Sequence, residues 1–287
     1  MPLTRPRPEL VCIPDISSRV SNQDVDIFFD FLDHGETGTT GTVIIGDRGR
    51  VHHAYFNNIL SARSGADFNN YNPDASTFMR PAIGTRFVRT NGATIGNAGL
   101  FGVQFPNGSI TGANYNVAVD ITKTYFATRM WINSATNLVY RFSNSPSTGT
   151  NTFNSTDLVG FEIDTSNSGN WFIMKGTSAG AISREDTSIV FSSSKCYTLV
   201  VAYQNSSTSV KFTIYEQSAA DTIPTIVYEQ TKTVTTQNMT SVMWGVKNLA
   251  AENKIAVADW FYWHSGVVLT PADQAVRVPF VLNSLLP

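Results

Sequence analysis

The feature that most constrains the fold is an alternation of apolar and polar residues in short runs that end at Gly, Asn, Ser or Pro. Residues 210–216, VKFTIYE, show it best, because Val210, Phe212 and Ile214 alternate with more polar neighbours. A period of two places one set of side chains on a buried face of a strand and the other set on a wetter face. Many such runs, at intervals of roughly ten to fifteen residues, predict a sandwich or barrel of short strands.

The stretch at 197–203 alternates in the same way, and the residues between the two runs, QNSSTS, are small and polar. The two runs therefore predict a hairpin. No helix-length segment separates the runs, which excludes βαβ crossovers and predicts an all-β fold with antiparallel sheets. The other strands are expected at 116–120, 125–132, 138–143, 158–164, 171–175, 188–191, 225–231, 241–246 and 255–263.

The N-terminal region departs from this pattern. Prolines at positions 2, 6, 8 and 14 fix φ and remove backbone donors, so residues 1–40 are expected to form an extended docking arm. Within it, the apolar run DVDIFFDFL at 24–32 needs a partner surface, either the chain's own sheet or a neighbouring subunit. The candidate docking residues of the arm are Arg5, Arg7, Ile27, Phe28, Phe29 and Phe31.

The rest of the chain divides into two parts. Residues 41–84 form a connection with short strands, in which 53–62 fits either a short helix or an irregular segment. Residues 85–287 form the sandwich. The one helix expected there starts at Thr270, because Pro271 and Asp273 suit a first helical turn, and it ends before Pro279.

Composition excludes several partners. Charged residues make up 15% of the chain and the net charge is -2, so the positive field typical of nucleic-acid-binding proteins is missing. No apolar run approaches the roughly 20 residues of a membrane span, and the N-terminus lacks the apolar core of a signal peptide. Cys12 and Cys196 are too few for a metal site, and Cys196 is expected to be an inert core thiol.

Several stretches resemble, in order and spacing, the concanavalin-A-like or laminin-G-like jelly roll. The resemblance covers roughly residues 85–287 and implies an antiparallel jelly-roll β-sandwich. The stretches are TKTYFATRMWINS (122–134), LVGFEID (158–164), NWFIMKG (170–176), the hairpin KCYTLVVAYQNSSTSVKFTIYE and the terminal IAVADWFYWHSGVVLTPADQAV (255–276).

The opening MPLTRPRPEL resembles a short Leu-Thr-Arg-Pro peptide at the start of some bacteriophage fibre and head-decoration proteins. This resemblance implies a protein of the virion surface. Its arm would dock onto other virion proteins while the jelly roll projects outward, commonly as a homotrimer.

The sharpest candidate for catalysis is the pair Glu162 and Asp164, because acids two apart on a strand point to the same face, as glycoside hydrolysis requires. Concanavalin-A-like glucanases carry a second glutamate two or three residues past the aspartate. Here those positions are Ser166 and Asn167, which cannot act as nucleophile or general acid in its place. We therefore expect a polar strand face and no enzymatic activity.

Metal and cofactor sites find little support. His52 and His53 are adjacent and would face opposite sides of a strand, while His34 lies in a glycine-rich loop. Asn248, Glu252 and Asn253 are able to supply oxygens to a calcium ion, but a loop without metal explains them equally well. No metal and no cofactor are expected.

Aromatic residues offer the remaining binding chemistry. Most are expected in the core, because a jelly roll needs large inward side chains. Tyr140, Trp171 and Tyr215 are the candidates for an exposed face on which sugar rings stack. The function expected is a tail-fibre or receptor-binding module that contacts host-surface glycans. The alternatives are a capsid decoration protein held by its arm and a carbohydrate-active enzyme.

Overall fold

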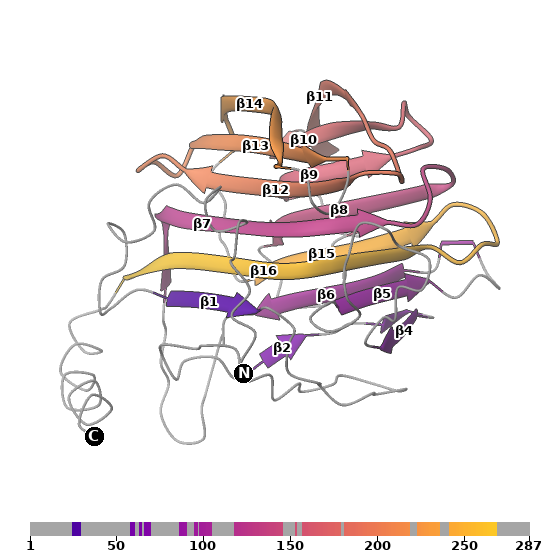
Figure 1. The fold of residues 1–287 in the computed structure, drawn as a ribbon. Coiled ribbons are helices and arrows are strands. Elements are labelled where there is room, and N and C mark those ends of the chain that lie inside the picture. Colours follow the sequence, from indigo (N-terminus) through magenta and orange to yellow (C-terminus); the bar gives the residue numbers. More distant parts are fainter. Residues whose placement is uncertain are drawn as a thin grey trace, which may run out of the picture.

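The structure is a computed structural model, and it describes residues 25–29, 58–60, 63–64, 66–69, 86–90, 95–96, 98–104, 118–145, 153, 157–178, 181–218, 223–235 and 241–268. These residues form strands and turns and contain no helix. None of the described segments is a helix long and apolar enough to cross a membrane. Two antiparallel sheets lie face to face, which confirms the predicted all-β sandwich (Figure 1).

The strands divide between two sheets, which we name sheet A and sheet B. Sheet A runs in the order β14 (Thr225–Thr233), β13 (Ser209–Gln217), β12 (Cys196–Tyr203), β7 (Ala118–Ile132), β16 (Ile255–Val268), β5 (Arg86–Thr90) and β4 (Ala66–Asn69), with β1 (Val25–Phe29) also paired to β16. Sheet B runs in the order β11 (Ala181–Val190), β10 (Asn170–Ser178), β9 (Val159–Asp164), β8 (Leu138–Ser145), β15 (Ser241–Asn248), β6 (Ala98–Gln104) and β2 (Asn58–Leu60), with β3 (Arg63–Ser64) also paired to β6.

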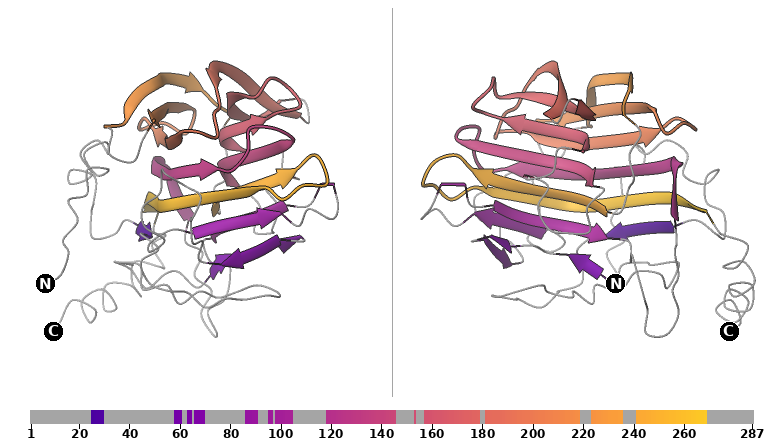
Figure 2. Two further views of the ribbon diagram at one scale, coloured as in Figure 1. Left: turned by 45° about the vertical axis from the view of Figure 1, so that its right-hand side comes forward. Right: turned by 180° about the vertical axis from the view of Figure 1, so that it is seen from behind.

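The chain crosses between the sheets repeatedly, as in a jelly roll. It passes from β7 in sheet A to β8 in sheet B, winds through β9, β10 and β11, and returns through β12, β13 and β14 to sheet A. Afterwards β15 pairs with β8 and β16 pairs with β7, so the last strands occupy the centres of both sheets. The two layers are seen from three sides in Figures 1 and 2.

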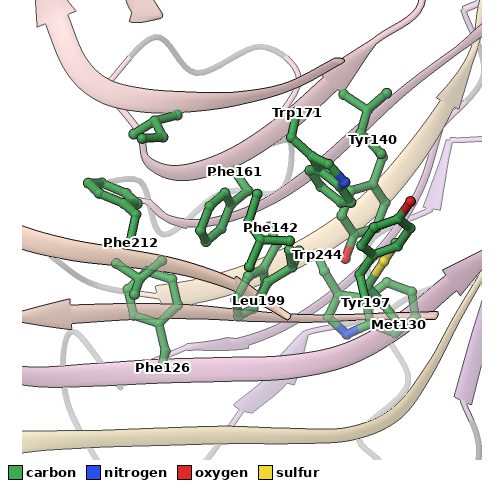
Figure 3. Packing of buried hydrophobic residues seen from close by; sticks show 14 of the residues in the cluster. Phe126, Met130, Tyr140, Phe142, Phe161, Trp171, Tyr197, Leu199, Phe212 and Trp244 are labelled. Atoms are coloured by element: carbon green, nitrogen blue, oxygen red, sulfur yellow. The ribbon is translucent and has the colours of Figure 1, made fainter. Parts of the chain in front are cut away.

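The period-two pattern explains which side chains fill the space between the sheets. In β12 and β13, Leu199 pairs with Ile214 and Val201 with Phe212, and all four are fully buried. The predicted hairpin is confirmed, and its turn contains Asn205 at φ 53°, a conformation that asparagine tolerates. Aromatic rings from both sheets interlock between the layers (Figure 3).

Several sequence predictions change in detail. The runs expected at 116–120 and 125–132 meet in one long strand, β7, which pairs with β16 on both sides of a register irregularity between Asp120 and Tyr125. The strand expected at 188–191 starts seven residues earlier, as β11. The predicted helix at 270–279 lies outside the described residues, as does most of 53–62.

The described N-terminal residues join the sandwich. Residues 25–29 form a strand that pairs with β16 of the same chain, so Ile27, Phe28 and Phe29 belong to sheet A, which is one of the two partner surfaces expected for this run. The strands β2, β3 and β4 also join the two sheets, which extends the sandwich in front of the predicted boundary at 85. Arg5, Arg7 and Phe31 lie outside the described residues.

Candidate functional site

The acidic pair singled out in the sequence lies on β9 at the outer face of sheet B. Phe161 and Ile163 point into the core, and the alternation therefore turns Glu162 and Asp164 outward on one face, as predicted. Their surroundings differ sharply: Glu162 is fully buried and Asp164 is only partly buried.

Glu162 is held by two arginines from different strands. Arg141, its direct neighbour on β8, donates from Nε to Glu162 Oε2 at 2.6 Å. Arg184 reaches over β10 from β11 and donates from Nε to Oε1 and from Nη2 to Oε2, the second contact at 3.2 Å. The Arg141 guanidinium also lies 5.4 Å from the centre of the Phe153 ring. We call these four residues the Glu162 cluster.

The electrostatics of the Glu162 cluster follow from its burial. Burial lowers the pKa of Arg141, while the charge and the hydrogen bond of Glu162 act in the opposite direction and keep the guanidinium charged. Both carboxylate oxygens of Glu162 already accept N–H donors. The two arginines therefore fix the position of this carboxylate by three charge-assisted hydrogen bonds.

Asp164 is committed to the turn that follows β9. Its Oδ1 accepts hydrogen bonds from the backbone N–H of Ser166 at 3.0 Å and from Ser166 Oγ at 2.6 Å. This arrangement is an Asx turn, the common use of an aspartate at the end of a strand. Ser166, one of the two positions where a glucanase would carry its second glutamate, is therefore part of this turn.

Two of the three aromatic binding candidates are core residues, which corrects the prediction of an exposed patch for them. Tyr140 and Trp171 are fully buried, because both take inward positions in the alternation of β8 and β10. Their rings meet edge to face with centroids 6.0 Å apart (Figure 3). Burial raises the pKa of Tyr140 well above its usual value.

Tyr215 lies differently, at an outward position of β13. It is partly buried and packs against an apolar cluster on the outer face of sheet A. Its neighbours across the strands are Thr198 on β12 and Ile226 on β14, and Ile226 is 53% exposed. Thr198, Tyr215 and Ile226 form what we call the Tyr215 patch, a row in which Thr198 is buried, Tyr215 is partly buried and Ile226 is exposed.

The loop proposed as an alternative calcium site carries a lysine instead. Lys254 is almost completely buried, and its Nζ donates to Glu252 Oε2 at 2.5 Å and to Ser134 Oγ at 3.0 Å. Asn137 Nδ2 also donates to Glu252 at 3.3 Å. The ammonium group thus neutralises the one acid of this loop. The described residues contain no group of three His, Cys, Asp or Glu suited to a metal ion.

The remaining candidates are placed as follows. Cys196 is a buried free thiol whose Sγ donates to the carbonyl oxygen of Met130 at 3.3 Å, which confirms the predicted core thiol. His264 is buried, whereas His34, His52 and His53 lie outside the described residues. Asn253 is exposed beside the Lys254 loop.

Sequence reasoning missed Arg141, Arg184 and Phe153. Arg141 offered one signal, because it is a charged residue in the apolar run LVYRF of the strand before β9. Arg184 offered none, since its contact with Glu162 depends on β10 lying between the two strands. Phe153 lies in a polar stretch in which no strand pattern places its ring.

Comparisons with known proteins bear on this fold. No family model matches the chain, and no curated protein matches it. A solved protein of unknown function from Shewanella oneidensis MR-1 is similar, with a TM-score of 0.52 and 15% identity over 93% of this chain and 97% of that chain.

Weaker matches include a Lotus tetragonolobus seed lectin and a Bacillus licheniformis β-glucanase. The lectin has a TM-score of 0.42 and 8% identity over 74% of this chain and 100% of its own. The glucanase has a TM-score of 0.44 and 10% identity over 83% of this chain and 97% of its own. Both likenesses are distant and concern the fold alone.

Proposed function

We propose that this chain is a binding module of a bacteriophage virion surface, of the tail-fibre or receptor-binding type, which contacts host-surface glycans without cleaving them. The observation that carries the proposal is the state of the acidic pair on β9. Glu162 is sequestered by two arginines and Asp164 closes a turn, so the outer face of sheet B presents ion pairs where a hydrolase needs two free carboxyl groups.

The Tyr215 patch is the proposed contact for a sugar ring. Sugar rings present C–H groups that pack on a flat aromatic face, and nearby hydroxyl and charged groups supply hydrogen bonds. On the same strand, four residues from Tyr215, the Lys211 Nζ lies 2.6 Å from Glu229 Oε1, and both of these side chains are exposed by more than a third. Together they offer one apolar face and several polar groups on the same side of sheet A.

The virion assignment is supported by the opening peptide MPLTRPRPEL and its resemblance to phage fibre and head-decoration proteins. On this proposal the arm at residues 1–24 docks onto other virion proteins, and the sandwich faces outward as part of a homotrimer. Deleting residues 1–24 keeps β1 in place and should abolish attachment to particles while the sandwich stays folded. Attachment that survives this deletion would contradict the docking role.

The glycan contact is tested with purified protein on immobilised host-surface glycans. We expect the wild type to bind at least one glycan, and Tyr215→Ala to weaken its Kd by at least about tenfold, which equals about 1.4 kcal/mol. The matched control is Ile95→Ala, which removes an exposed aliphatic side chain outside the patch and should leave the Kd unchanged.

Two other results would replace the proposed glycan-binding function with a different one. Binding to empty capsids without any glycan binding would make the chain a decoration protein. Release of shorter sugars from a bound polysaccharide would make it an enzyme, and loss of that release in Glu162→Gln would place Glu162 in the mechanism.

A further inference from the structure

The guanidinium of Arg184 has more hydrogen-bond donors than its contacts in the Glu162 cluster use. Arg184 binds Glu162 through Nε and Nη2, and its Nη1 makes no hydrogen bond to any residue that the structure describes. The two terminal nitrogens of a guanidinium each carry two N–H groups, and side by side they match both oxygens of a carboxylate. Arg184 therefore keeps one fork of donors for a second carboxylate while it holds Glu162.

The charges of the Glu162 cluster do not balance. Arg141 and Glu162 form a buried pair, with side chains 7% and 0% exposed, and their two charges cancel. Arg184 brings a second cation to the same carboxylate, and its side chain stays 31% exposed. The cluster thus carries one more positive charge than negative, and the surplus lies on the side chain that solvent reaches. Such a surplus attracts an anion.

The position of Arg184 in the sheet prepares its guanidinium for a ligand. β11 is the outermost described strand at one end of sheet B (Figure 1), and Arg184 lies on it opposite Met174 of β10. The side chain extends over β10 to Glu162, where two hydrogen bonds hold it. A donor whose rotamers are already fixed loses little conformational entropy when a ligand binds.

Two acids on the same face of sheet B have other hydrogen-bond partners. Asp164 accepts hydrogen bonds from Ser166 in the turn after β9. Asp186, two residues from Arg184 on β11, accepts the Asn170 amide at 3.0 Å and the backbone N–H of Ser188 at 2.6 Å. The negative charge of Asp186 weakens the attraction of Arg184 for an anion, so removal of that charge should strengthen anion binding.

We propose that the fork of Arg184 binds the carboxylate of an acidic sugar, such as a uronic acid unit of a host-surface glycan. The inference rests on the proposed glycan-binding function and adds a second contact, separate from the Tyr215 patch. The carboxylate accepts N–H groups from Nη1 and Nη2 side by side. The partly buried ring of Phe153, next to Arg141, offers an apolar surface on this face for the C–H groups of the sugar.

Titration of the full chain with sodium glucuronate, followed by nuclear magnetic resonance, tests the site. Glucose is the neutral counterpart, because it carries a hydroxymethyl group in place of the carboxylate. We expect glucuronate to bind with a Kd in about the millimolar range, and glucose to bind at least about tenfold more weakly. Arg184→Gln should weaken glucuronate binding at least about tenfold.

Three further variants support this comparison, and circular dichroism checks that each is folded. Arg184→Lys keeps a cation for Glu162 but presents no fork, so it should also weaken glucuronate binding, and it serves if Arg184→Gln does not fold. Lys195→Gln is the matched control, because the Lys195 side chain is 35% exposed and pairs with Glu216. It should leave the Kd unchanged. Asp186→Asn keeps an acceptor for Ser188 and should strengthen glucuronate binding about two- to threefold.

Equal binding of glucuronate by the wild type and by Arg184→Gln would overturn the proposal. Sodium acetate that binds as tightly as glucuronate would overturn it too, because the sugar would then contribute nothing. Neutral glycans that bind through Tyr215, without any binding of glucuronate, would reject the Arg184 site and leave the proposed function standing. Glucuronate binding that is lost in Arg184→Gln and retained in Tyr215→Ala would support the Arg184 site, even if the Tyr215 patch binds no glycan.

Discussion

At the scale of single residues, the outer face of sheet B is closely packed. Gly160 on β9 faces Ser143 on β8, and a Cβ atom at Gly160 would lie 2.1 Å from the carbonyl oxygen of Phe142 and 2.6 Å from the Cα of Ser143. Both obstacles are backbone atoms and cannot turn aside. The glycine is therefore required by the close approach of the two strands that carry Glu162 and Arg141.

We expect Gly160→Ala to lower the free energy of unfolding by about 2 kcal/mol or more, because β8 and β9 must move apart. Gly169→Ala is the matched control. A Cβ atom there meets nothing within 4 Å, but φ is 73°, so the cost should be that of the left-handed backbone alone, about 1 kcal/mol. Urea unfolding followed by circular dichroism measures both, and an equal loss in the two variants would contradict the packing argument.

The charge of Glu162 is a second single-residue contribution to the stability of the fold. Glu162→Gln leaves the buried Arg141 without its counterion, and breaking a buried pair in this way costs about 3 kcal/mol or more. Glu229→Gln removes the exposed partner of Lys211 and should cost less than about 1 kcal/mol. The urea midpoints of the two variants provide the test. If both shift equally, the Glu162 cluster is no stronger than a surface ion pair.

At the scale of elements, β11 and β14 are the outermost described strands at one end of each sheet, and they carry charges that discourage pairing with other chains. These charges also join the two sheets. Glu185 Oε2 on β11 accepts a hydrogen bond from Lys175 Nζ on β10 at 2.9 Å. The other carboxylate oxygen, Oε1, lies 2.5 Å from Lys232 Nζ on β14. One carboxylate thus links the end of sheet B to the end of sheet A.

This link predicts a pH dependence of stability. Hydrogen bonds from Lys232 and Lys175 lower the pKa of Glu185 below its ordinary value of 4.5. A carboxyl group whose pKa is lower in the folded chain contributes stability above its unfolded pKa, and the contribution is lost as the pH falls through the folded pKa. Glu185→Gln should therefore have a lower free energy of unfolding than the wild type at about pH 7. This gap should shrink at about pH 3.

The measurement is urea unfolding of both proteins at the two pH values. Because Glu185 is about one third exposed, the expected difference at neutral pH is small, below about 1 kcal/mol. A gap of the same size at both pH values would show that the carboxylate charge contributes nothing to the link between the sheets.

At the scale of the whole molecule, one aromatic core belongs to both sheets. Trp171 of sheet B meets Tyr197 of sheet A edge to face with ring centroids 5.3 Å apart, and Phe161 meets Phe212 at 5.6 Å (Figure 3). Neither sheet buries its inner face without the other. Both sheets are therefore expected to unfold together.

Trp171→Ala should lower the free energy of unfolding by about 3–5 kcal/mol, because it leaves a large cavity among rings from both sheets. Near-UV and far-UV circular dichroism should still follow one transition. Trp171→Phe retains a ring and should lose less. Two separate transitions in the wild type would contradict the shared core.

Much of this architecture could be predicted from local patterns. The hairpin of β12 and β13, the strand β9 with its outward acids, and the buried Cys196 all follow from a period of two and from polar turns. The long strand β7 was predicted in two pieces, since Asp120, Thr122 and Lys123 interrupt the apolar pattern with polar side chains that remain within the strand. Placing Tyr140 and Trp171 on an exposed face was wrong, because both occupy inward positions.

The sequence by itself determined the strands, their antiparallel class and the face on which Glu162 and Asp164 lie, because these depend on neighbours a few residues away. Only the tertiary structure decided what Glu162 does, since Arg141 and Arg184 reach it from β8 and β11. It also decided where residues 25–29 of the apolar run are accommodated, because β1 pairs with a strand near the other end of the chain. Local periodicity orients a side chain, whereas its partners depend on which strands become neighbours.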